Sequence, residues 1–281
     1  MHGRDPPAAD VTEGCAGPGS GAPPRTPAWR VALSLFTVLP AGVGGDLDEG
    51  AAARAIFWLP AIGAGLGLAG AGAMVFVAAG AASPERQLLG AALAVMLLAL
   101  LTGGLHLDGL ADTADGLGSR RPADQALEIM RRSDAGPFGV AALVLVLLVQ
   151  VAALASLPHG WAGAGGLVLA TVTSRVAVVL ATGSPSARPS GFGALVAGRT
   201  SAAGRAATVL ILLGAVVAAG LALGGVAAAA RGAAATAAGL VVAALLRWAA
   251  RRRLGGMTGD VFGAIIELST ATTLLVLILA S

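Results

Sequence analysis

Lysine and tyrosine are absent from this 281-residue chain, cysteine occurs once, and charged side chains of either sign are scarce. Charged residues make up 12% of the sequence, whereas a soluble domain carries about 25%. The lone cysteine, Cys15, excludes a disulfide framework and a cysteine-based metal site within the chain. Aromatic residues amount to 4%, and the 18 arginines form no clustered basic face with interleaved aromatics, which argues against nucleic acid as a partner.

Long apolar runs make up most of the chain. Hydrophobic residues account for 56% of it, and the mean hydropathy is +0.83. Runs of about 18 residues or more can cross a bilayer as helices, so we predict an all-α, polytopic integral membrane helical bundle with about seven transmembrane helices, within a range of six to eight. The predicted spans are residues 55–80, 88–104, 138–157, 161–183, 206–229, 233–247 and 262–280.

The N-terminal part differs from these spans. Residues 1–28 are rich in Gly, Pro and Ala, a composition typical of a disordered tail, and residues 29–281 would then form one integral membrane domain. The apolar segment 30–40 is short, so we expect it to lie at the interface or to re-enter the membrane. Pro60 falls inside the first predicted span, where we expect a kink.

Arginine placement predicts how the bundle is oriented. Loops 105–136, 184–205 and 247–261 hold eleven arginines, whereas the alternate loops hold only Arg86 and Arg231. Because basic residues concentrate in cytoplasmic loops, we expect a multi-pass protein of the bacterial cell (cytoplasmic) membrane, with these loops and any site in them facing the cytoplasm.

The first polar segment contains "GGLHLDGLADTADG", residues 103–116. Asp108, Asp112 and Asp115 are four and seven residues apart, which places them on one face of a helix. Carboxylates gathered in this way favour a hard divalent cation such as Mg²⁺, Mn²⁺ or Ca²⁺, although a solvated helix end with incidental acids is the alternative. Gly109 and Gly116 would leave room for a bulky group beside them.

His106 precedes this aspartate face by two residues and lies off it. It is a candidate acid–base group or ligand, and a packing or hydrogen-bonding histidine is the alternative.

A second polar segment reads "GGMTGDVFGAIIELS", residues 255–269. Asp260 and Glu267 again share a helical face, and Glu267 stands within an apolar run, where an acid usually faces the bundle interior and binds something. Gly256 and Gly259 suit a loop that approaches a phosphate closely. The alternative is a hinge loop with an acid that is satisfied inside the core.

Three further residues are candidates for substrate binding. Arg175 lies in the middle of an apolar run and could pair with Glu267 or with a substrate phosphate. Arg131 and Ser133 lie just before a predicted span, where they could also be a membrane anchor and a helix cap. Acids, a divalent metal and arginines together are suited to phosphoryl-group transfer, so the residues indicate a membrane enzyme that acts on a diphosphate.

These motifs resemble the cobalamin synthase family, the adenosylcobinamide-GDP ribazoletransferases. The resemblance rests on "GGLHLDGLADTADG" and "GGMTGDVFGAIIEL", and on "FTVLP" at 36–40, "WLPAIGAGLG" at 58–67 and "TSR" at 173–175. The matches follow the family's order over roughly residues 29–281.

The resemblance implies a late step of cobalamin biosynthesis in which adenosylcobinamide-GDP joins α-ribazole, or its 5′-phosphate, and GMP is released. It implies Mg²⁺ as cofactor, with Asp108, Asp112 and Asp115 as the metal and diphosphate site. Membrane lipid would surround the protein. Other late corrinoid-pathway enzymes and a second copy of the chain are further candidate partners. The chain departs from many members at Arg132-Ser133-Asp134, where they read Asp-Ser-Arg, and at Val38, where they have arginine.

Two other classes of protein compete with this interpretation. A CDP-alcohol phosphotransferase-like lipid enzyme also uses spaced aspartates, and Asp112, Asp115 and Gly116 fit the start of that pattern, but its later glycine and paired aspartates are missing. A membrane transporter would explain Arg175 and Glu267 but not the polar cluster on one side, and no inverted repeat is evident.

Overall fold

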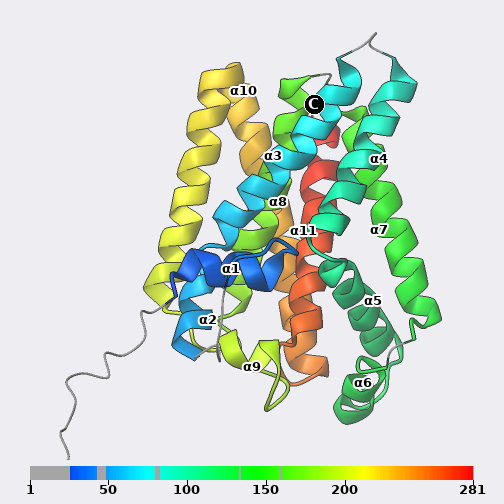
Figure 1. Ribbon diagram of the computed structural model, residues 1–281, viewed down its shortest axis with the longest axis vertical. Coiled ribbons are helices and arrows are strands. Elements are labelled where there is room, and N and C mark those ends of the chain that lie inside the picture. Colours follow the sequence, from blue (N-terminus) through cyan, green and yellow to red (C-terminus); the bar gives the residue numbers. More distant parts are fainter. Residues whose placement is uncertain (1–25, 43–48, 80–82, 133, 159, 281) are drawn as a thin grey trace, which may run out of the picture.

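The computed structural model describes residues 26–42, 49–79, 83–132, 134–158 and 160–280, which form helices joined by short loops (Figure 1). Among these residues the only β-type pairing is a single bridge between Ser186 and Met257. The all-α prediction is therefore confirmed. The helices, in chain order, are α1 (Ala28–Phe36), α2 (Glu49–Ile56), α3 (Leu59–Ala78), α4 (Pro84–Leu101), α5 (Leu105–Gly118), α6 (Ala123–Ile129), α7 (Pro137–Ser156), α8 (Trp161–Ala181), α9 (Phe192–Val196), α10 (Ala202–Arg253) and α11 (Gly259–Leu279).

Within the described part of the chain, six helices are long and apolar enough to cross a bilayer, namely α3, α4, α7, α8, α10 and α11. Large apolar side chains such as Phe76, Ile211 and Leu223 are exposed on them. Apolar surface on this scale would be unfavourable in water and fits contact with lipid. The predicted polytopic membrane bundle is confirmed.

Helix α10 is a helical hairpin. Its 52 residues would measure about 78 Å if straight, far more than the roughly 30 Å of a hydrocarbon core. Gly224 and Gly225 leave helical geometry, and a Cβ added to Gly220 would lie 2.4 Å from the Ala229 Cα, so the two arms pack against each other. The arms, residues 202–223 and 226–253, are each long enough to cross, which brings the described crossings to seven.

The turn of this hairpin lies earlier than expected. The predicted spans 206–229 and 233–247 placed it near residue 231, whereas the backbone turns at Gly224-Gly225. Gly225 takes a φ of 70°, a conformation that L side chains rarely adopt, while the alanine run that follows is helical. The boundary was therefore set by the glycine pair and not by the end of the apolar run.

The first predicted span, 55–80, is divided in two. Helix α2 ends at Ile56, and α3 begins at Leu59 with Pro60 in its first turn. Proline is tolerated there because the first N–H groups of a helix have no intrahelical partner. The expected kink at Pro60 is therefore wrong: this proline begins a helix. Helix α1 covers most of the short segment 30–40 and lies across the spans (Figure 1), and the predicted tail 1–28 lies almost wholly outside the described residues.

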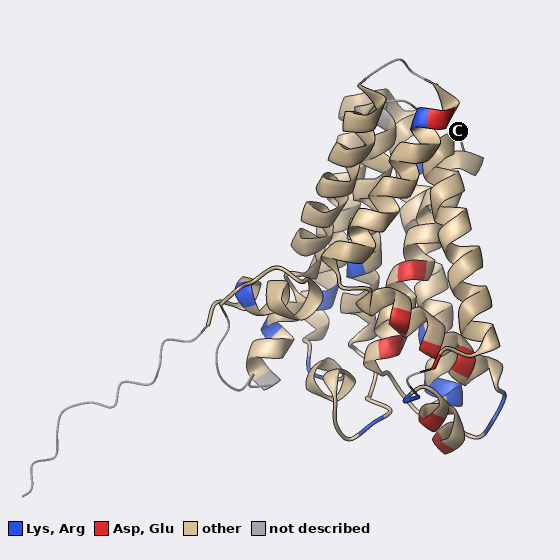
Figure 2. Ribbon diagram, turned by 45° about the vertical axis from the view of Figure 1, so that its right-hand side comes forward, with Lys and Arg blue, Asp and Glu red and all other residues tan. Residues whose placement is uncertain are grey.

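Charged residues gather at one end of the bundle. Figure 2 shows them mainly around α5, α6, α9 and the start of α11, while the opposite end carries few. The largest apolar cluster packs α1, α2, α8, α9, α10 and α11 together at this end, through residues such as Phe36, Val196 and Ile265. A packed core thus supports the polar loops.

Candidate active site

Helix α5 carries the three aspartates of the first motif at the polar end. Their spacing predicted one helix, and Asp108, Asp112 and Asp115 do lie in it. Their surroundings differ, because Asp108 is exposed, Asp112 is half-buried and Asp115 is buried. Asp108 and Asp112 are thus the two that remain open to a ligand.

The Asp115 carboxylate binds the start of a neighbouring helix. The backbone N–H groups of Gly136 and Gly139 donate to its two oxygens at 2.6 Å and 2.9 Å. These N–H groups belong to the first turn of α7, where the helix has no partners of its own for them and where negative charge is favoured. Asp115 therefore joins α5 to α7, and its role as a metal ligand stays a prediction.

Glycines bring α11 against α5. A Cβ on Gly109 would lie 2.7 Å from the Asp260 carbonyl oxygen, and one on Gly263 would lie 3.1 Å from the His106 carbonyl oxygen. The space beside Gly109, which we expected a substrate group to use, is filled by the α11 backbone. Gly116 likewise faces Met130 of the segment after α6. The expectation of open space at these glycines is wrong, and Gly109 serves instead to bring Asp260 beside the α5 carboxylates.

The loop before α9 contributes an arginine to the same place. The Met257 N–H donates to the Pro185 carbonyl at 2.8 Å, and the Ala187 N–H donates to the Met257 carbonyl at 2.9 Å. A Cβ on Gly256 would collide with this pairing, at 2.5 Å from the Pro185 carbonyl oxygen. Gly256 thus allows two backbone segments to meet, and its role beside a phosphate stays a prediction.

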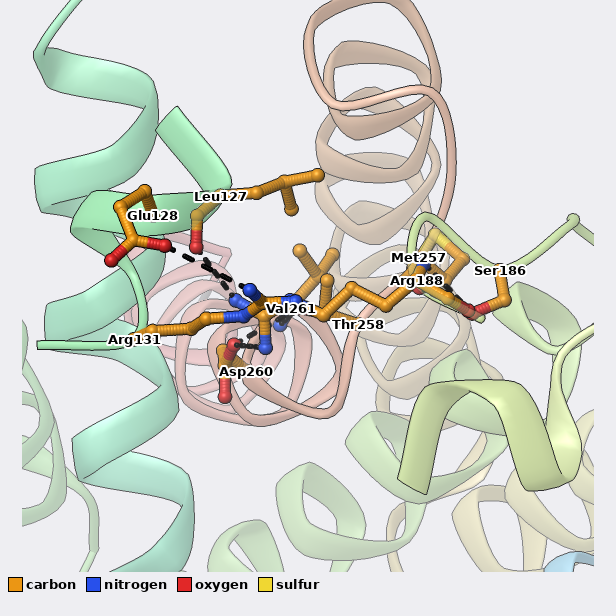
Figure 3. Close-up of polar contacts among 9 residues, drawn as sticks. All are labelled: Leu127, Glu128, Arg131, Ser186, Arg188, Met257, Thr258, Asp260 and Val261. Atoms are coloured by element: carbon orange, nitrogen blue, oxygen red, sulfur yellow. Dashed lines mark hydrogen bonds and ion pairs between the residues drawn. The ribbon is translucent and has the colours of Figure 1, made fainter. Parts of the chain in front are cut away.

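Arg188 extends from this paired loop toward Asp260, as Figure 3 shows. Its Nη1 donates to Asp260 Oδ2 at 3.3 Å, and its Nη2 donates to the Leu127 carbonyl at 3.1 Å. The Thr258 hydroxyl donates to the same Asp260 oxygen at 3.2 Å. Asp260 is therefore fixed at the start of α11 between a guanidinium and the α5 carboxylates.

The clustered acids change the ionisation of Asp112. Burial, together with the negative charges of Asp108, Asp260 and Asp115, raises the pKa of Asp112 to about 7, while the charge of Arg188 opposes this shift. A carboxyl group with such neighbours is stabilised by any cation that neutralises the cluster. The site is thus prepared for a divalent cation or another strongly positive group.

A cavity of about 190 Å³ opens beside these residues. Asp108, Arg188, Asp260 and His106 are its polar lining residues, and Gly259 also lines it, while contact of Gly259 with a phosphate stays a prediction. The rest of its lining is mainly apolar and comes from α1, α5, α9 and α11. The cavity therefore offers both charged and apolar walls to one ligand.

A smaller polar cavity lies deeper in the bundle. Its volume of about 20 Å³ suits about one water molecule, and His106, Gln150, Arg175 and Glu267 line it. Gln150 Nε2 donates to Glu267 Oε2 at 2.8 Å, and Arg175 Nη1 donates to the Ser174 hydroxyl at 3.1 Å. The structure shows no direct ion pair between Arg175 and Glu267, both of which are described, so the predicted contact is not made.

His106 lies between the two cavities. It is 4% exposed, and its Nε2 has no hydrogen-bond partner among the described residues. Burial, together with the charge of Arg175, lowers the pKa of His106 well below its usual value. The imidazole is therefore neutral at physiological pH, and its role in the reaction stays a prediction.

Two predicted residues near α6 lie outside this arrangement. Arg131 is more than half exposed and forms an ion pair with Glu128 at 3.8 Å (Figure 3). Ser133 lies outside the described residues. Substrate binding by either one stays a prediction.

The metal prediction can be compared with the donor set. Among the described residues, no three Asp, Glu, His or Cys side chains are already close enough to hold one metal ion together. The cluster of Asp108, Asp112 and Asp260 nevertheless supplies only oxygen donors, and its mutual repulsion raises the Asp112 pKa. Such donors suit Mg²⁺, which is bound by a few carboxylates together with water and substrate phosphates.

Sequence reasoning missed Arg188 as a site residue. It was one of many arginines in the polar loops, and nothing in its neighbours sets it apart from Arg199 or Arg205. Its partner Asp260 is 72 residues away in the sequence, and the pairing depends on the backbone contact at Met257. Only the fold brings the two together.

Fold and site together define a polytopic helical membrane protein with an acidic, arginine-containing site at its polar end. The profile of the Cobalamin-5-phosphate synthase family matches residues 28–278, nearly the whole described bundle. The chain therefore belongs to this family.

Individual relatives agree with this placement. A protein of Frankia casuarinae is 42% identical over 260 residues, covering 88% of this chain and 93% of its own. One of Bradyrhizobium diazoefficiens is 39% identical, with 88% and 91% covered, and one of Pseudomonas putida is 38% identical, with 91% and 99% covered. Each of the three is named adenosylcobinamide-GDP ribazoletransferase. No solved structure matches the chain significantly.

Proposed function

We propose that this chain is an adenosylcobinamide-GDP ribazoletransferase that carries out a late step of cobalamin biosynthesis. The observation that carries the proposal is the cluster of Asp108, Asp112 and Asp260, which come from the two motifs by which the sequence resembles its family, together with Arg188. A cluster of acids with a guanidinium is suited to a substrate with a diphosphate bond, and the relatives are named for such a donor.

The reaction breaks a phosphoanhydride bond and forms a phosphodiester bond. A ribose hydroxyl oxygen of α-ribazole, or of its 5′-phosphate, bonds to the phosphorus attached to cobinamide. The bond from that phosphorus to the bridging oxygen breaks, GMP leaves with this oxygen, and the hydroxyl proton is released. No oxidation or reduction takes place, so the protein needs to bind, orient and neutralise charge.

Asp108, Asp112 and Asp260 would hold Mg²⁺ in this proposal, and Asp115 would support them from the start of α7. The ion supplies charge neutralisation of the diphosphate and of the departing phosphate. Arg188 lies beside Asp260. Its two terminal nitrogens are positioned by the hydrogen bonds that they donate to Asp260 and to the Leu127 carbonyl. It is suited to orient a phosphate oxygen by paired hydrogen bonds.

The polar end of the bundle would face the cytoplasm of the bacterial cell. The arginines of the α5–α7 and α8–α10 loops and of the last turn of α10 support this orientation through the preference of basic residues for the cytoplasmic side. Both substrates would then reach the site from the cytoplasm.

GMP release by the purified, detergent-solubilised protein tests the function. It receives adenosylcobinamide-GDP, α-ribazole and Mg²⁺, and each is left out in turn. Release that requires both substrates supports the proposal, and release that also requires the metal supports the role of Mg²⁺. A folded sample that releases no GMP, but releases CMP from a CDP-linked lipid donor, would replace this function by that of a lipid phosphotransferase.

A further inference from the structure

Three phenylalanines from separate helices meet at the apolar side of the 190 Å³ cavity. The rings of Phe36 (α1) and Phe192 (α9) have centroids 5.3 Å apart at 84°, and those of Phe192 and Phe262 (α11) have centroids 6.3 Å apart at 82°. Edge-to-face contacts of this kind fix the orientation of each ring. Phe36 and Phe262 are almost fully buried, whereas Phe192 keeps part of its surface open.

The cavity that these rings line also contains charged groups. Asp108, Arg188 and Asp260 line the same cavity, and Leu35, Leu105 and Ile266 extend its apolar side. A ligand that fills the cavity therefore meets both aromatic rings and charged groups.

The cavity volume excludes the corrin ring as the occupant. Sites for drug-sized ligands occupy about 300–1,000 Å³, and a corrin macrocycle is larger than most such ligands. A single bicyclic base is of a size that 190 Å³ can accept.

The chemistry of the wall distinguishes between the two bases in the reaction. The edge of guanine carries several hydrogen-bond donors and acceptors, which a wall of Phe, Leu and Ile would leave unsatisfied. The base of α-ribazole is a benzimidazole with two methyl groups, and its outer edge has no polar atom to satisfy. An apolar aromatic wall accepts this base and disfavours guanine.

We propose that Phe36, Phe192 and Phe262 form the binding site for the benzimidazole base of the acceptor, with its ribose directed toward Asp108 and Arg188. The inference rests on the proposed function, because it assigns one of the substrates to a part of the same site. Phe192 is the residue that contacts the base most directly, since its ring is the least buried of the three.

Steady-state kinetics with variants of Phe192 test this assignment. For Phe192→Ala we expect the KM for α-ribazole to rise about 10- to 100-fold, because most of the apolar contact is lost. The KM for adenosylcobinamide-GDP and the kcat at saturating α-ribazole remain within about twofold of the parent. Phe192→Tyr, which keeps the ring, restores a KM near that of the parent.

The matched control is Phe76→Ala. Phe76 is 83% exposed on α3 and lines none of the cavities described above, so this variant should leave both KM values unchanged. An unchanged KM for α-ribazole in Phe192→Ala, or an equal rise in the KM for both substrates, would overturn the assignment.

A binding measurement separates this inference from the proposed function. Calorimetry with 5,6-dimethylbenzimidazole riboside alone, and with guanosine alone, needs no turnover. Binding of the riboside that Phe192→Ala weakens supports the base site even if the parent protein releases no GMP. Failure of the parent to bind the riboside, or binding of guanosine that depends on Phe192, contradicts the base site whether or not GMP is released.

Discussion

Asp112 is the residue at which the demands of folding and of ligand binding conflict most. It is half-buried. Burial and the negative charges of Asp108, Asp260 and Asp115 together raise its pKa to about 7. A protein gains no stability from gathering acids in this way. The arrangement makes sense when a cation joins the acids, as in the proposed diphosphate site.

Replacing Asp112 by asparagine should separate activity from stability. We expect Asp112→Asn to lower GMP release by about 100-fold or more, the usual effect of removing one group that stabilises developing charge. The variant should melt at the same temperature as the parent or higher, because a repelled carboxyl is removed. Asp124→Asn, at an exposed acid of α6, is the control and should change neither quantity. Full activity in Asp112→Asn would show that Asp112 has no role in the site.

The binding of Mg²⁺ should depend on pH through the same carboxyl. With a pKa of about 7, Asp112 is mainly protonated below pH 7 in the metal-free protein, and a cation must displace this proton. The apparent affinity for Mg²⁺ should therefore fall about tenfold for each pH unit below 7 and level off above it. Mg²⁺ titrations followed by thermal unfolding at pH 6, 7 and 8 measure this. A slope that is equally steep in Asp112→Asn would assign the proton to another group.

At the scale of helices, the site depends on how α5 contacts its neighbours. Asp115 links α5 to the first turn of α7, and Gly109 and Gly263 allow α5 and α11 to touch. The helical spacing of the aspartates predicted α5 correctly. The partners of α5 could not be predicted, because the glycines that permit close contact look the same in the sequence as glycines that face lipid.

Asp115→Ala should destabilise the protein by about 1–2 kcal/mol, as expected for the loss of a side chain that accepts from the first N–H groups of a helix. Asp115→Asn keeps one of the two oxygen acceptors and turns an NH2 group toward the other N–H, so it should lose part of this stability. Urea unfolding in detergent compares the two, and Mg²⁺ binding should stay near the parent value in Asp115→Asn. A loss of Mg²⁺ affinity as large as that in Asp112→Asn would show that Asp115 is a metal ligand.

Gly109→Ala should move α11 away from α5. The added Cβ meets the Asp260 carbonyl oxygen at 2.7 Å, so backbone must shift, at a cost of about 1–3 kcal/mol. We expect a lower melting temperature and reduced GMP release, because Asp260 is displaced. Gly72→Ala is the control, since nothing lies within 4 Å of its added Cβ. Equal behaviour of the two variants would mean that the helix contact does not position the site.

At the scale of the whole molecule, hydropathy predicted most of the architecture. The spans α4, α7, α8 and α11 lie within a few residues of their predicted bounds, since long apolar runs have few alternatives to a membrane helix. The turn of α10 and the start of α3 were misplaced, because Gly224-Gly225 and Pro60 act through backbone geometry and not through hydropathy. The pairing of Arg188 with Asp260 could not be predicted from the sequence, because it depends on contacts between segments that are distant in the chain.

The orientation in the membrane can be measured with single cysteines. In a Cys15→Ser background, Glu85→Cys marks the sparsely charged end, and Ser190→Cys marks the loop beside the site, both at exposed positions. A membrane-impermeant maleimide added to intact bacteria should label Glu85→Cys and leave Ser190→Cys unlabelled until the membrane is opened. The reverse pattern would place the site outside the cytoplasm.

The distribution of the site over the chain also affects its biogenesis. Asp108 and Asp112 are synthesised with α5. Arg188 follows with the loop before α9, and Asp260 is synthesised with α11, the last helix that the structure describes. The nascent protein therefore inserts most of its crossings before the acidic cluster is complete. A polypeptide interrupted before α11 would lack Asp260 in its site, so we expect substrate turnover to begin only once α11 has been synthesised and inserted.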